Sequence, residues 1–111
     1  MKARNTSQTG WTFYRVGNLV YLSHNKTISG VAANYRYINQ GTAPSGYRPV
    51  KIYYSNGMRT NSDVVKGEFF LEINTNGVTG FISTATHSEL QSYTASGCYV
   101  TEDSFPTSDK I

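Results

Sequence analysis

The chain has 111 residues, of which 15% are charged, and its formal net charge at pH 7 is +3. This length suits one domain rather than two, and no apolar run approaches the ~20 residues that a membrane span needs. The Lys and Arg residues are scattered from Lys2 to Lys110, whereas a nucleic-acid-binding surface gathers its cations into a patch. A nucleic-acid binder that stacks bases on tyrosines remains a minor alternative.

The sequence contains no recognisable catalytic or metal-binding pattern. Cys98 is the only cysteine, and neither His24 nor His87 belongs to a metal-ligand spacing. We therefore expect Cys98 to be a small buried apolar residue. Glu68 and Glu72 would lie roughly 13 Å apart along an extended strand, beyond the ~5–9.5 Å of a glycosidase carboxylate pair. We predict that the chain is not an enzyme and uses no metal or cofactor.

Residues 1–10 are polar and lack any apolar periodicity. They are expected to form a flexible arm, or the truncated neck of a longer parent chain, and we favour the neck. Residues 11–111 would then form the single folded domain.

The first strong strand signal is a hairpin. Trp11–Val16 and Leu19–Ile28 flank Gly17-Asn18, two residues that tolerate the positive φ of a two-residue turn. This turn predicts that Val16 lies opposite Leu19 and that Trp11 lies opposite His24.

Both faces of this hairpin are apolar. Since side chains alternate along a strand, one face carries Trp11, Phe13, Val20 and Leu22, and the other carries Tyr14, Val16, Leu19 and Tyr21. The second face needs a cover. Either identical copies of the chain supply it, in a cyclic homo-oligomer, or a second sheet of the same chain does.

Further strands are predicted along the chain. They are residues 50–55, closed by Asn56-Gly57; residues 67–75 and 78–83, joined by Asn76-Gly77; and residues 99–101, introduced by Ser96-Gly97. Residues 29–49, 58–63 and 83–96 are expected to be loops, with one or two helical turns possible at 84–91. Glu102 and Asp103 are expected to be solvated charges. The pattern predicts an all-β domain: an antiparallel β-sandwich or a jelly-roll-like barrel.

Four motifs, taken in order, resemble the head domains that end tail-fibre and baseplate proteins of tailed bacteriophages. They are WTFYRVGNLVYL at residues 11–22, PSGYRP at 44–49, GEFFLEINTNGV at 67–78 and YVT at 99–101. The likeness covers residues 11–101, which is most of the chain. A shaft like that of a complete fibre protein is absent from the sequence.

The resemblance implies a homotrimeric β-sandwich that acts outside the cell, on the virion, at the tail tip or baseplate. Such a head adheres to cell-surface saccharides of the host, here a Gram-positive bacterium, and joins other tail or baseplate proteins through its N-terminal part. The alternative is a purely structural tail or baseplate domain with protein contacts only. Because loops vary freely among such heads, the resemblance assigns no binding residue.

A saccharide site is expected where an aromatic ring can stack on a pyranose and planar polar groups can bind hydroxyls. The first candidates lie in residues 34–40 and are Asn34, Tyr35, Arg36, Tyr37 and Asn39. The alternative for this segment is an ordinary strand whose tyrosines pack inside the sandwich. The second candidates are His87, Gln91 and Tyr93, and the third are Arg59 and Asn61.

Overall fold

The computed structural model describes residues 3–8 and 10–106, and within them the regular structure is entirely β-strand. The strands are β1 (Ala3–Gln8), β2 (Trp11–Val16), β3 (Leu19–Ile28), β4 (Arg36–Thr42), β5 (Tyr53–Asn61), β6 (Val64–Ile73), β7 (Val78–Ser83) and β8 (Gln91–Val100). They form one antiparallel sheet in the order β1-β2-β3-β8-β5-β6-β7-β4. The prediction of an all-β antiparallel domain is confirmed. Within the described ranges there is no helix that could cross a membrane.

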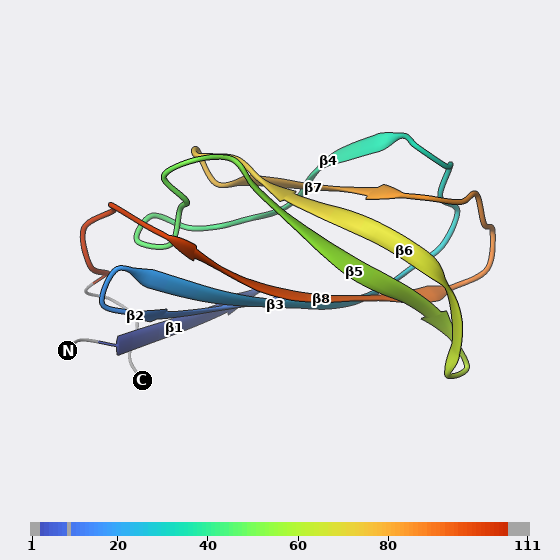
Figure 1. The fold of residues 1–111 in the computed structure, drawn as a ribbon, viewed down its shortest axis with the longest axis horizontal. Coiled ribbons are helices and arrows are strands. Elements are labelled where there is room, and N and C mark those ends of the chain that lie inside the picture. Colours follow the sequence, from blue (N-terminus) through green and yellow to red (C-terminus); the bar gives the residue numbers. More distant parts are fainter. Residues whose placement is uncertain (1–2, 9, 107–111) are drawn as a thin grey trace.

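The sheet curls so that its two ends face each other, an arrangement that fits a β-sandwich (Figure 1). Strands β1, β2, β3 and β8 form one layer, β4, β7 and β6 form the other, and β5 crosses between them. The core between the layers is built from large apolar side chains: Trp11, Phe13, Val20, Leu22, Tyr47, Phe69, Leu71, Ile73, Phe81, Tyr93 and Tyr99. We call the opposite side of the sheet, which points away from this core, the outer face.

The first hairpin has the predicted register. Val16 pairs with Leu19 and Trp11 with His24, and Gly17 has a φ of 59° in the turn. The four side chains predicted to share one face, including Trp11, are all buried in the core.

The other face of the hairpin remains open. Tyr14, Leu19 and Tyr21 are 38%, 40% and 46% exposed, so no second sheet within residues 3–8 and 10–106 covers them. Cys98 lies opposite Tyr21 on β8 and is also exposed. The prediction of a buried Cys98 was wrong, because the alternation along β8 places Tyr99 in the core and Cys98 on the outer face.

Strand β1 occupies part of the segment that was expected to be an arm. Residues 3–8 pair antiparallel with β2 along its whole length, with Gln8 opposite Trp11. Gly10, at a φ of 82°, lies in the connection. An edge strand is held through backbone hydrogen bonds, so its side chains need not show the apolar alternation of a core strand.

Two predicted turns are continuous strand instead. Strand β5 runs through Asn56-Gly57, and β8 runs through Ser96-Gly97. A Cβ on Gly57 would lie 2.3 Å from the Phe69 ring, and one on Gly97 would lie 1.9 Å from the Tyr53 hydroxyl. Both glycines therefore mark close packing.

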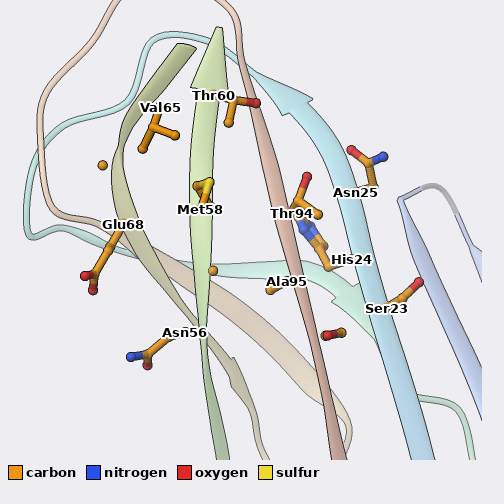
Figure 2. Close-up of a pocket in the computed structure, with 13 residues that line it drawn as sticks. Ser23, His24, Asn25, Asn56, Met58, Thr60, Val65, Glu68, Thr94 and Ala95 are labelled. Carbon is orange, nitrogen blue, oxygen red and sulfur yellow. The ribbon is translucent and has the colours of Figure 1, made fainter. Parts of the chain in front are cut away.

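The turn between β5 and β6 lies at Ser62 and Asp63, whose φ angles are 48° and 65°. Beside it, β6 contains a bulge: Arg59 pairs with Gly67 but Thr60 pairs with Val65. An open depression on the outer face lies next to this bulge (Figure 2).

The predicted loops are shorter than expected. The segment 29–49 contains β4, 58–63 falls mainly in β5, and 83–96 contains the start of β8. Residues 84–90 form no helical turn. Each of these strands pairs with a segment far along the chain, which local sequence patterns do not reveal.

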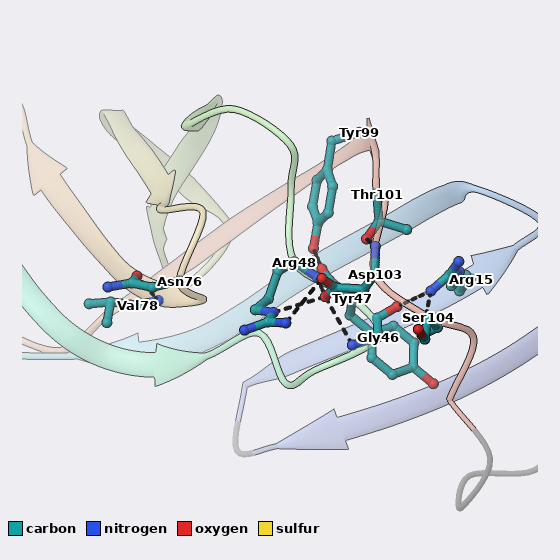
Figure 3. Close-up of polar contacts among 10 residues, drawn as sticks. All are labelled: Arg15, Gly46, Tyr47, Arg48, Asn76, Val78, Tyr99, Thr101, Asp103 and Ser104. Carbon is teal, nitrogen blue, oxygen red and sulfur yellow. Dashed lines mark hydrogen bonds and ion pairs between the residues drawn. The ribbon is translucent and has the colours of Figure 1, made fainter.

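The PSGYRP turn is tied to the C-terminal segment by Asp103 (Figure 3). The backbone N–H groups of Gly46 and Arg48 each donate to the Asp103 carboxylate at 3.0 Å, and the Arg48 guanidinium donates to it at 2.9 and 3.1 Å. From β2, Arg15 donates to the carbonyls of Gly46 and Ser104, at 2.7 and 3.2 Å. The prediction of a solvated Asp103 was wrong, because its side chain is only 17% exposed and holds two distant segments together.

Asp103→Asn is expected to lower the free energy of unfolding by about 1–3 kcal/mol, because charge-assisted hydrogen bonds become weaker or are lost. Burial alone would raise the pKa of Asp103, but the bonds from Arg48 and Gly46 outweigh it and hold that pKa below its ordinary value. The bonds therefore stabilise the fold above the carboxyl's ordinary pKa, and this contribution is lost as pH falls through the lowered pKa. Chemical denaturation at neutral pH and at about pH 3 measures both effects.

The matched control is Glu102→Gln, which neutralises the adjacent exposed carboxylate. It should leave the free energy of unfolding nearly unchanged. If Asp103→Asn loses as much stability on acidification as the parent protein, the carboxylate does not stabilise the fold in this way.

Candidate functional site

The first predicted segment contributes both exposed and packed side chains. Tyr35 is 58% exposed and contacts Tyr37 edge-on, with ring centroids 4.7 Å apart. Tyr37 is half-buried, stacks on Phe81 and accepts a hydrogen bond from the Ala32 N–H. Tyr37 thus fits the alternative of a strand tyrosine packed in the sandwich, whereas Tyr35 is available at the surface.

Of the two asparagines predicted as site residues in this segment, the structure describes the side chain of Asn34 but not that of Asn39. Asn34 is exposed, has a φ of 60° and donates its backbone N–H to the Ser83 carbonyl at 2.8 Å. The backbone of Asn39 lies in β4, but its side chain is outside the described part of the structure.

Arg36, at the start of β4, forms a bidentate ion pair with Glu72 of β6. Its Nε donates to Glu72 Oε1 at 2.8 Å, and its Nη2 donates to Oε2. Asn74 donates its side-chain N–H to the same Oε2 at 2.8 Å. The bond from Arg36 lowers the pKa of Glu72 against the opposing effect of burial, and the same bond raises the pKa of Arg36. Both groups are therefore charged at neutral pH, and the pair has no net charge.

Tyr54 places an exposed aromatic ring beside this pair. It lies opposite Glu72 in the β5–β6 ladder, so the two side chains share the outer face, and it is 61% exposed. The sequence analysis missed Tyr54, Glu72 and Asn74 as site residues. We refer to Arg36, Tyr54, Glu72 and Asn74 as the Arg36–Glu72 surface; Tyr35 packs against Tyr37 instead and is not part of it.

The second and third sets of candidates are mostly internal. Arg59, His87, Gln91 and Tyr93 are all buried. The Arg59 guanidinium donates to Gln91 Oε1 at 2.8 Å, and the Tyr93 hydroxyl is 2.6 Å from His87 Nε2. The Asn61 side chain donates to the Leu90 carbonyl at 2.7 Å. The four buried side chains form polar contacts inside the domain and offer no surface to a saccharide.

The described residues, 3–8 and 10–106, include no group of three or more His, Cys, Asp or Glu side chains that could hold a metal ion. No known family model matches the sequence, and no curated protein is significantly similar to it.

Proposed function

We propose that this chain is the receptor-binding head domain of a tail-fibre or baseplate protein of a tailed bacteriophage, and that it adheres to saccharides on the host cell surface. The observation that carries the saccharide part is the Arg36–Glu72 surface. The exposed Tyr54 ring lies beside a bidentate ion pair there, and strands hold most of the surface.

The chemistry of this surface suits a sugar. The Tyr54 ring offers an apolar face to the C–H side of a pyranose, and Arg36, about half of whose side chain is exposed, supplies N–H donors for hydroxyls, while the buried Glu72 holds the guanidinium in place. Because the ion pair fixes the guanidinium and the carboxylate, little side-chain entropy is lost on binding. The zero net charge of the pair favours a neutral ligand.

The proposal includes a homotrimer and a position on the virion, at the tail tip or baseplate. The exposed apolar surface at Tyr14, Leu19 and Tyr21 supports self-association, because identical copies could bury it in a closed ring. The resemblance of the four ordered motifs to phage head domains supports the phage assignment. The same resemblance supports a Gram-positive host and attachment to other tail proteins. The jelly-roll-like description of the fold belongs to the same proposal.

A purely structural tail or baseplate domain is the second candidate function. The same exposed surface of Tyr14, Leu19 and Tyr21 favours it, since protein contacts alone could cover these side chains. The two candidates differ at the Arg36–Glu72 surface, which a structural domain does not need for host adhesion.

Binding to an array of bacterial glycans tests the proposal. Wild-type protein should bind at least one cell-surface glycan, and Arg36→Ala and Tyr54→Ala should each weaken that binding by about tenfold or more, since each removes polar or stacking contacts. Glu89→Gln, at an exposed position in residues 84–90, is the matched control and should bind like wild type. A correctly folded protein that binds no glycan, or variants that bind as well as wild type, would favour the structural candidate.

A further inference from the structure

The outer face contains a second surface that the sequence analysis did not identify. Where β3, β8, β5 and β6 lie side by side, it is hollowed into an open depression of about 1070 Å³ (Figure 2). The bulge in β6 borders this depression, and Lys66 is the extra residue of the bulge. Gly67 beside it has a φ of 141°, a backbone conformation that glycine adopts readily and other residues rarely do. The bulge thus shapes one side of the depression.

Six of the thirteen residues that line this depression have short polar side chains, although apolar atoms make up most of its surface. The six are Ser23, Asn25, Asn56, Thr60, Thr94 and Ser96. In the described part of the chain, none of these side chains has a hydrogen-bond partner in the protein. Their hydroxyl and amide groups are therefore free to exchange water for the hydroxyls of a ligand.

The lining residues form a row across four strands. Asn25 of β3 lies opposite Thr94 of β8, which lies opposite Met58 of β5, which lies opposite Glu68 of β6. At about 4.8 Å per strand this row is roughly 14 Å long. Met58, which is half-exposed in the middle of the row, offers an apolar contact between polar groups.

The charge of the lining selects among saccharides. Glu68 carries its only carboxylate, and none of its members is Lys or Arg. His24 contributes no cation at neutral pH, because burial lowers its pKa and outweighs the opposing effect of the hydrogen bond that its ring Nδ1 donates to the Tyr93 carbonyl at 2.8 Å. The lining itself therefore offers a phosphate-bearing polymer no cation and would repel it through Glu68, while Lys26 and Lys66, next in sequence to lining residues, lie outside it.

From these contacts we infer that the depression binds a neutral, hydroxyl-rich saccharide chain. The inference rests on the proposed function and specifies its ligand. The ligand could extend to the Arg36–Glu72 surface, because Met58 and Tyr54 lie four residues apart on the same face of β5, roughly 13 Å along the strand.

The test uses full-length protein and an array of matched bacterial glycans with and without phosphate groups. Thr94→Glu, which fills the row and adds charge, should weaken binding to the neutral glycans by about tenfold or more, and Asn25→Ala should weaken it by a smaller factor. Ser88→Glu adds the same charge at an exposed position in residues 84–90 and should bind like wild type. Binding should change less than about twofold between ~50 and ~500 mM salt, because no ion pair with the ligand forms.

The outcomes separate this inference from the function on which it rests. If Arg36→Ala loses binding while folded Thr94→Glu and Asn25→Ala bind like wild type, the depression is not a subsite, although the chain still binds saccharide. A preference for phosphate-bearing glycans that declines steeply with salt would overturn the neutral ligand class. If wild-type protein binds no glycan at all, both proposals fail.

Discussion

Replacement of Arg59 by alanine is expected to lower the free energy of unfolding by about 3–5 kcal/mol. The guanidinium is almost fully buried and donates to four acceptors, none of which is a carboxylate. They are the carbonyls of Glu68 and Lys66, the side-chain oxygen of Gln91 and the hydroxyl of Thr84. Alanine would remove the Arg59 donors from these acceptors and create a cavity between β5, β6 and β8, although the Glu68 carbonyl would keep the bond from the Thr84 hydroxyl. Since a domain of this size is stable by only about 5–15 kcal/mol, this loss is severe.

Urea denaturation, followed by the fluorescence of the buried Trp11, measures this effect. Lys51→Ala is the control: it removes a long cationic side chain from an exposed position and should cost far less stability. A loss below about 1 kcal/mol for Arg59→Ala would mean that water readily replaces the buried guanidinium, contrary to the packing described above.

Replacement of both Tyr14 and Tyr21 by aspartate is expected to convert the proposed homotrimer into a monomer. The two rings lie opposite each other on the open face of the first hairpin, with centroids 6.5 Å apart. Burial of apolar surface contributes about 25 cal/mol per Å², and two buried unpaired carboxylates would oppose it. Light scattering should give three times the 12.3-kDa chain mass for wild type and one chain mass for the variant.

The reactivity of the exposed Cys98 thiol reports independently on the same interface, because Cys98 lies opposite Tyr21 on β8. It should react slowly with a thiol reagent in the assembly and rapidly in the aspartate variant. Thr27→Asp, at an exposed position near the far end of β3, should leave the mass unchanged. A wild-type protein with one chain mass at micromolar concentration would contradict the trimer, whatever the thiol does.

The parts of the fold that the sequence predicted well are those set by local patterns. The first hairpin and the hairpin around Asn76-Gly77 both have short turns between apolar strands, and both form where expected. Gly17 and Gly77 adopt the positive φ that their turns need. Alternation along β2 and β3 also assigned the correct side chains to the core.

The errors come from contacts between distant segments. Asn56-Gly57 has the composition of a turn, yet β5 continues through it because Gly57 packs against Phe69 and the Thr94 carbonyl. The actual turn at Ser62 and Asp63 needs positive φ at two residues without glycine, which a sequence pattern does not favour. Asp103 likewise finds its partners 55 and 57 residues earlier in the chain.

The candidate site was predictable only in part for the same reason. The sequence predicted Arg36 as a candidate site residue, but Glu72 is 36 residues away from Arg36, and Tyr54 reaches the candidate site only through strand pairing. The second candidates, such as His87 and Tyr93, have side chains typical of a sugar site. Their burial depends on how β8 packs into the core, which the sequence alone did not specify.

The most direct test of saccharide adhesion is binding of labelled protein to intact Gram-positive cells before and after periodate oxidation, which cleaves the vicinal diols of sugars. The account predicts that wild-type protein binds untreated cells, that oxidation abolishes this binding, and that protease treatment of the cells leaves it intact. Binding that survives oxidation and is lost after protease treatment would contradict the account, because the receptor would then be a protein.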